Sequence, residues 1–160
     1  MKRFFFLVMI AGLIACNQSS EQEVAQGSWI KGSQAEQLEL IEKHFRGFGK
    51  AMVEMDYRYQ ELYWAGQDQN WDYAEHQLEE MTSDFELALQ RRPNRAESAE
   101  QFLTFAIPQM ENSIESKDLE TFNRAYQMLS MSCNSCHALE NVPFFHVQIP
   151  TERRSSIRKP

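Results

Sequence analysis

Residues 118–139 read D-L-E-T-F-N-R-A-Y-Q-M-L-S-M-S-C-N-S-C-H-A-L. Apolar and sulfur-bearing side chains recur in this stretch at steps of three and four, the spacing of one face of an α-helix. Asp118 stands where an N-cap residue would accept hydrogen bonds from the first free backbone N–H groups. The stretch therefore predicts an amphipathic helix packed against other helices. Its predicted inward residues are Leu119, Phe122, Tyr126, Leu129, Cys133 and Cys136.

A longer helical pattern covers residues 33–65. Ser33 and Glu36 have the spacing of a capping box, in which each residue satisfies a free backbone N–H group of the other. The apolar positions form one continuous stripe, although Gly47 and Gly49 interrupt it, and each glycine costs about 1 kcal/mol relative to alanine inside a helix. We predict a single long helix here. Its predicted inward residues are Leu38, Ile41, Phe45, Phe48, Met52, Met55, Tyr59 and Leu62.

Two shorter patterns lie between these helices. A helix over residues 71–91 should begin at an Asn70 cap and end before Pro93, which cannot continue a helix. Asn94 should cap the next helix, in which Pro108 should introduce a kink. Because the connections are short, neighbouring helices should run antiparallel. The inward residues are Ala74, Leu78, Met81, Phe85 and Leu89 or Ala88 in the first, and Phe102, Leu103, Ala106, Met110 and Ile114 in the second.

The composition fits one globular domain. The chain has 160 residues, of which 42% are hydrophobic and 11 are Phe, so it can bury a substantial core. Its 16 basic and 23 acidic residues give a formal net charge of −7, which argues against a nucleic-acid-binding protein. Three cysteines are too few for a domain held together by disulfides. The predicted fold is all-α, an antiparallel four-helix bundle over residues 33–139.

The first residues have the pattern of a secretion signal. A short basic start precedes an apolar run over residues 4–15 that is too short to span a bilayer. Residues 13–16, L-I-A-C, resemble a bacterial lipobox, in which Cys16 is lipidated and becomes the new N-terminus; a signal peptide with a chance cysteine is the alternative. Asn17 is not the Asp associated with inner-membrane retention, which favours attachment to the outer membrane, facing the periplasm. Residues 1–15 are thus the expected lipoprotein signal peptide.

The bundle is flanked by two segments of different character. Residues 16–32 are polar and are expected to form a flexible tether. Residues 140–160 include Pro143 and Pro150, which exclude a regular helix. The first half of this tail is apolar and should pack back on the bundle, whereas its basic end should be solvated or, alternatively, dock an acidic partner. The apolar residues are Phe144, Phe145, Val147 and Ile149, and the basic ones are Arg153, Arg154, Arg158 and Lys159.

The pattern that carries chemistry is C-x-x-C-H at residues 133–137, the attachment signature of a c-type haem. On a helix, Cys133, Cys136 and His137 project from one face, so two thiols can form thioethers while the imidazole reaches the iron. One covalent haem c is therefore expected near the C-terminal end of the fourth helix. Two alternatives remain open: a Cys133–Cys136 disulfide, and a structural zinc site that adds His146 as a fourth ligand.

A C-x-x-C-H motif at the end of the last of four helices resembles the cytochrome c-prime family. The resemblance covers residues 33–139 and is architectural except at Cys133, Cys136 and His137, which match the family's motif. It implies a haem inside an antiparallel bundle with His137 as the proximal iron ligand. Members of that family are often dimers, so a homodimer is a possible assembly. The lipoprotein tether, the long first helix and the Phe-rich tail depart from the family pattern.

The other side of the iron should face the first half of the long helix. Met52 lies on its inward stripe and is a possible distal ligand, since a thioether can bind haem iron. His44 is the alternative ligand; Met55 and His146 are lesser candidates. An open site lined by Phe45 and Phe48 is the third arrangement.

Two functions follow from these arrangements. A lipid-anchored haem protein in the periplasm could carry electrons to and from a redox partner protein, which is the preferred prediction. An open site could instead bind small gases such as nitric oxide or carbon monoxide. An enzyme is not predicted, although a peroxidase would find its distal acid–base group only in His44.

Overall fold

The computed structural model describes residues 27–159, so the signal peptide, Cys16 and most of the expected tether lie outside the described residues. The described part is helical, with no β-strand within that range. Two compact units are present, one ending at His44 and the other beginning at Phe45. Among the helices of residues 27–159, none is long and apolar enough to cross a membrane.

The first unit contains helix α2, Gln34–Phe45. The predicted capping box is confirmed. The Ser33 N–H donates to Glu36 Oε2 at 2.7 Å, and the Glu36 N–H donates to Ser33 Oγ at 3.4 Å. The Ser33 N–H and the Ser33 hydroxyl both donate to Glu36 Oε2, and these two hydrogen bonds hold the pKa of Glu36 below its usual value. The His44 ring meets the edge of Trp29 in the same unit, with ring centroids 4.7 Å apart.

The prediction of one helix over residues 33–65 is wrong. Helix α2 stops at Phe45, and α3 runs over Phe48–Gln67 after a break in which Arg46 has a φ of 61°. Leu38 and Phe45, predicted to be inward, are 59% and 64% exposed. Helical spacing alone does not keep a helix continuous, because most helical stability in proteins comes from burying one face. The compact helical unit therefore starts later than the predicted residue 33.

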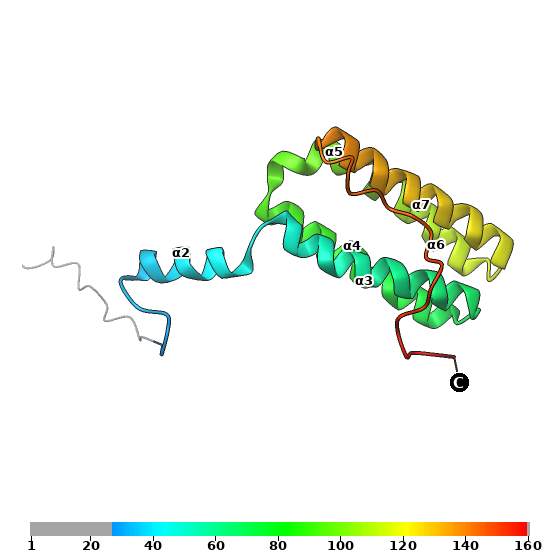
Figure 1. The fold of residues 1–160 in the computed structure, drawn as a ribbon, viewed down its shortest axis with the longest axis horizontal. Coiled ribbons are helices and arrows are strands. Elements are labelled where there is room, and N and C mark those ends of the chain that lie inside the picture. Colours follow the sequence, from blue (N-terminus) through cyan, green and yellow to red (C-terminus); the bar gives the residue numbers. More distant parts are fainter. Residues whose placement is uncertain (1–26, 160) are drawn as a thin grey trace, which may run out of the picture. The chain divides into compact units, whose positions relative to one another are not determined.

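The second unit is built from α3, α4 (Trp71–Arg91), α6 (Ile107–Glu115) and α7 (Leu119–Leu139). Helix α3 packs on α4, α4 on α6, α6 on α7 and α7 on α3, which closes the ring. Consecutive helices run in opposite directions (Figure 1). The buried face of α7 is as predicted at Phe122, Tyr126 and Leu129, each of which is fully buried.

The connections correct several details. The α4 bounds agree with the prediction, but Asn70 makes no side-chain cap hydrogen bond within the described chain. Asn94 does not cap a helix; it lies inside the 3₁₀ turn η2, Pro93–Arg95. The Asp118 cap is confirmed, since its carboxylate accepts from the Thr121 N–H at 2.8 Å.

The predicted third helix is divided rather than only kinked. Helix α5, Ala96–Gln101, continues into the π-helical segment η3, Phe102–Ala106, and then into α6. Pro108 lies in the first turn of α6, where its missing N–H and its ring disturb the preceding turn. A π-segment just before the proline is one way for the chain to relieve that conflict.

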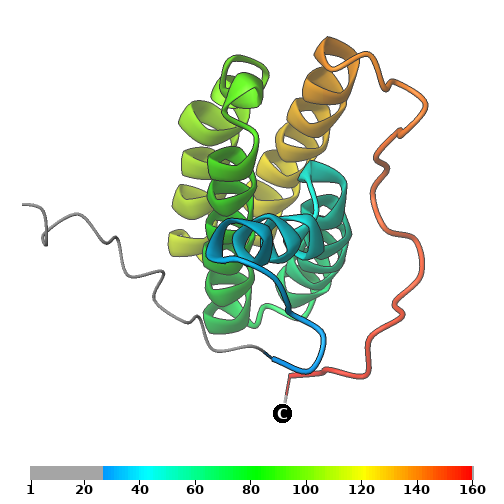
Figure 2. The ribbon, with the colours of Figure 1, turned by 90° about the vertical axis from the view of Figure 1, so that its left-hand side faces the viewer.

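The tail crosses back along the second unit as an extended segment (Figure 2). We call residues 142–150 the strap. Val147 and Ile149 are partly buried against the core, as predicted, but Phe144 and Phe145 are 72% and 62% exposed and the prediction that they are covered is wrong. Beyond the strap, Arg153 is held on the bundle: its guanidinium contacts Asp68 at 2.9 Å and lies over the Trp64 ring.

Candidate functional site

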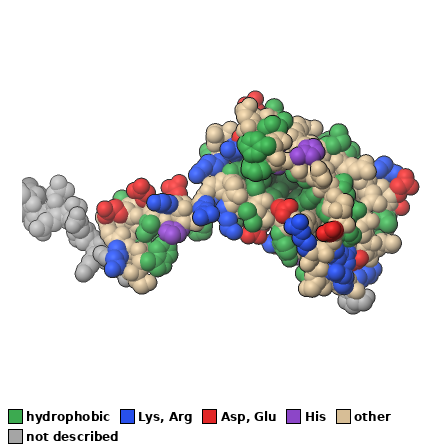
Figure 3. Space-filling model, in the orientation of Figure 1, with side chains coloured by type: hydrophobic (Ala, Val, Ile, Leu, Met, Phe, Trp, Pro, Cys, Tyr) green, Lys and Arg blue, Asp and Glu red, His purple; other side chains and the backbone are tan. Residues whose placement is uncertain are grey.

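A cavity of about 930 Å³ lies in the second unit, between the first half of α3, the end of α7 and the strap. Its size falls within the range of roughly 300–1,000 Å³ that is usual for cofactor and ligand sites. Figure 3 shows hydrophobic side chains gathered around a hollow on this part of the molecule. Its apolar lining residues include Phe48, Met52, Met55, Met81, Phe85, Phe102, Val147 and Ile149.

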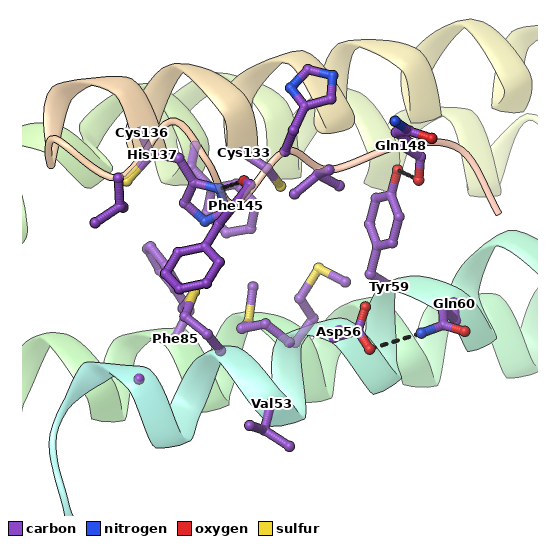
Figure 4. A pocket seen from close by; sticks show the side chains of 18 of the residues that line it. Val53, Asp56, Tyr59, Gln60, Phe85, Cys133, Cys136, His137, Phe145 and Gln148 are labelled. Carbon is purple, nitrogen blue, oxygen red and sulfur yellow. Dashed lines mark hydrogen bonds between the residues drawn. The ribbon is translucent and has the colours of Figure 1, made fainter.

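All three chemically active side chains of the C-x-x-C-H motif line this cavity. Cys133, Cys136 and His137 come from the last turns of α7. Their spacing places them on one helical face, and the buried face of α7 continues into them from Leu129. Figure 4 shows the three side chains along the same wall of the cavity.

Both motif cysteines are free thiols in the structure. Burial raises the pKa of Cys133 to about 12, with a smaller contribution from the neighbouring Cys136. The pKa of Cys136 is also raised, chiefly by burial and further by Glu140, while the Ser98 hydrogen bond and Arg95 oppose that shift. Both thiols are therefore protonated at neutral pH, and a buried protonated thiol reacts slowly with oxidants. The disulfide alternative is not the state seen here.

The His137 ring is oriented by the strap. Its Nδ1 lies 2.5 Å from the backbone carbonyl oxygen of Phe145. A carbonyl oxygen only accepts hydrogen bonds, so Nδ1 carries the proton and donates it. In neutral imidazole the lone pair then resides on Nε2, the atom left available for a metal. Histidines that bind metals in proteins commonly have their second ring nitrogen fixed by a partner of this kind.

The opposite wall of the cavity is formed by α3. Phe48, Met52 and Met55 line it, and Met52 is half-buried there. Two other residues predicted for the distal side are Phe45 and His44. Phe45 is an exposed residue at the end of α2 and does not line the cavity, and His44 belongs to the first unit. The long-helix prediction placed them here, and the break before α3 removes the register on which it depended.

Two residues of the site, Arg95 and Tyr59, make contacts that carried no sequence signal. Arg95 lines the cavity, forms an ion pair with Glu140 and lies over the Phe48 ring at 5.1 Å. The Tyr59 hydroxyl donates to the carbonyl oxygen of Gln148 at 3.2 Å and so ties the strap to α3. These residue types are common on helical surfaces and in cores, and only the packing of α3, α5 and the tail brings them together.

The zinc alternative lacks a ligand set in this arrangement. His146 lines the cavity, but within residues 27–159 no three His, Cys, Asp or Glu side chains converge on a position that could hold a metal ion. A haem requires less of the protein, since only one histidine need reach the iron and the thiols bond to the macrocycle.

Comparisons of the chain with protein-family models, curated proteins and solved structures find no match. Assignment of a function must therefore come from the site itself.

Proposed function

We propose that the protein is a c-type haem protein of the cytochrome c-prime-like bundle type that carries electrons. One observation carries the proposal: both thiols of C-x-x-C-H and an imidazole with a free Nε2 line one large, mostly apolar cavity. This donor set fits a haem c. Cys133 and Cys136 would hold the macrocycle, and His137 would be the proximal ligand.

The attachment chemistry uses what these residues provide. A thiol S–H adds across a vinyl C=C bond, so that sulfur bonds to one carbon and hydrogen to the other, without a leaving group or a net oxidant. Both thiols are unpaired in the structure and are therefore available for this addition. When bound, the haem supplies an iron that accepts and returns one electron. The apolar walls would keep water from the iron and help to set its potential.

The α3 wall favours electron transfer over gas binding. Met52 is half-buried on this wall, where its thioether is available as a distal ligand. An iron with two protein ligands exchanges electrons without first losing or gaining a ligand. Gas binding would need the distal position to be open, with Phe48 and Met55 as apolar walls.

The proposed cellular location rests on the sequence at the N-terminal end of the chain. We place the protein in the periplasm, lipid-anchored through Cys16, most simply at the outer membrane. Anchoring would keep it near a redox partner protein and raise the effective concentration of the pair. A homodimer remains compatible with this proposal.

The test is the absorption spectrum of the full chain made with a haem-maturation system, recorded oxidised and reduced. We expect a Soret band and sharp reduced α and β bands, as for a six-coordinate haem. Met52→Leu should convert the iron to high spin, whereas the control Met55→Leu, on the same helix and also lining the cavity, should not. If the iron of the wild-type protein is already high-spin and neither substitution changes its spectrum, gas binding replaces electron transfer as the proposed function. The absence of a Soret band would overturn the haem assignment.

A further inference from the structure

Asn134 lies between the two motif cysteines, at a position that the haem-attachment pattern leaves free. Its side chain makes two hydrogen bonds with a single residue of the strap. Asn134 Nδ2 donates to the Val147 carbonyl oxygen at 2.9 Å, and the Val147 N–H donates to Asn134 Oδ1 at 2.8 Å. A carboxamide presents a donor and an acceptor side by side, so it can pair with a backbone residue as a neighbouring strand would.

We call the two hydrogen bonds between Asn134 and Val147 the clamp. The clamp lies close to the backbone carbonyl that orients His137. The Phe145 carbonyl is two residues before Val147, roughly 7 Å along an extended chain. No regular secondary structure holds the strap, whose residues are unassigned or in turns. Its backbone register beside α7 therefore depends on individual contacts. Two of these are the Asn134 clamp and the Tyr59 hydrogen bond to Gln148.

The strap side chains add little that could replace the clamp at that point. Phe144 and Phe145 are largely exposed, so burial does not fix the chain there. Val147 is partly buried against the core, and its own backbone is the part that Asn134 holds. The turn before Phe145 has contacts of its own, since the Val142 N–H donates to the His137 carbonyl oxygen at 2.8 Å and the Phe145 N–H donates to the Val142 carbonyl oxygen at 3.0 Å. The clamp holds the chain on the other side of Phe145, so its loss would loosen the Phe145 carbonyl from that side while leaving α7 intact.

We infer that Asn134 is a positioning residue for the proximal histidine, acting through the strap. It fixes the Phe145 carbonyl against Nδ1 of His137, and this contact sets the ring's orientation and tautomer and strengthens Nε2 as an iron ligand. The inference rests on the proposed haem function, since a ligand strength matters only if iron is bound. It gives the first variable position of the C-x-x-C-H motif a role in this chain.

The experiment compares Asn134→Ala with the wild-type full chain and with Ser135→Ala. Ser135 is the other residue between the cysteines, and it is also half-buried on α7. The first measurement is hydrogen exchange at the Val147 amide, which does not require haem. Loss of two hydrogen bonds should accelerate this exchange about tenfold in Asn134→Ala. Ser135→Ala should leave it unchanged.

The second measurement is the reduction potential of the haem-loaded protein. A weaker proximal ligand stabilises ferric iron less, so Asn134→Ala should shift the potential to more positive values, and Ser135→Ala should not. Asn134→Asp keeps the acceptor for the Val147 N–H and should show intermediate exchange, which guards against a folding defect in the alanine variant.

Each outcome decides the inference. Unchanged exchange in Asn134→Ala overturns the clamp. Faster exchange with an unchanged potential overturns the positioning role while leaving the haem assignment intact. Wild-type protein without haem overturns the proposed function, and the positioning role with it, whatever the exchange measurement shows. Faster exchange together with a more positive potential supports the inference.

Discussion

Two glycines of α3 should respond in opposite ways to the same substitution. Gly66 is buried where α3 meets α7, and a Cβ built there would lie 2.1 Å from Cε1 of Phe122. Gly49 lies in the first turn of the same helix, and a Cβ there would meet nothing within 4 Å. Helix propensity alone predicts that alanine stabilises both positions by roughly 0.5–1 kcal/mol.

At Gly66, close packing makes the alanine substitution destabilising rather than stabilising. Carbon atoms in contact prefer about 3.5–4.0 Å, so the methyl group and the ring must separate by more than 1 Å. Phe122 is fully buried and has no free space to enter. Overpacking of this kind costs about 1–3 kcal/mol, and more in severe cases. After the propensity gain is subtracted, Gly66→Ala should destabilise the fold by roughly 1–2 kcal/mol.

Thermal unfolding followed by circular dichroism measures both effects. A change of 1 kcal/mol shifts the melting temperature of a domain of this size by roughly 3–6 °C. Gly66→Ala should therefore melt several degrees lower than wild type, and Gly49→Ala the same or slightly higher. Equal stabilisation by the two changes would refute the close approach of α3 and α7 at Phe122.

Two other predictions concern the N-terminal cap of α7 and the lipidation of Cys16. Asp118→Ala should lower the melting temperature at pH 7, because the Thr121 hydrogen bond to the Asp118 carboxylate caps α7 and holds the folded-state pKa of Asp118 below its ordinary value. The stabilisation by this carboxylate is therefore present above the ordinary pKa and is lost as the pH falls through the folded-state pKa. The melting temperatures of variant and wild type should converge in acid. Cys16→Ser should move the protein from the membrane to the soluble fraction in cell fractionation, and continued membrane attachment would contradict the lipobox assignment.

Much of the helical architecture was predictable because local rules and burial agree there. The α7 bounds follow from a capping aspartate and an apolar stripe whose middle, residues 122–129, is buried, and α4 ends where Pro93 forbids continuation. The prediction of one continuous helix over residues 33–65 was wrong because an apolar stripe shows only that a helix, if formed, would be amphipathic. Whether two helical segments remain one depends on what covers each of them, and Leu38 and Phe45 are left exposed.

The candidate site, too, was predictable from the sequence only in part. Cys133, Cys136 and His137 share a helical face by spacing alone, so the sequence by itself determined that these three side chains lie side by side. The opposite wall depended on the register of α3, and only the tertiary structure decided that Phe48 and Met52 line the cavity and that Phe45 does not. The Asn134–Val147 pair joins residues 13 positions apart through an irregular strap. No periodicity encodes such a contact, because it depends on where the tail settles against the bundle after the helices have packed.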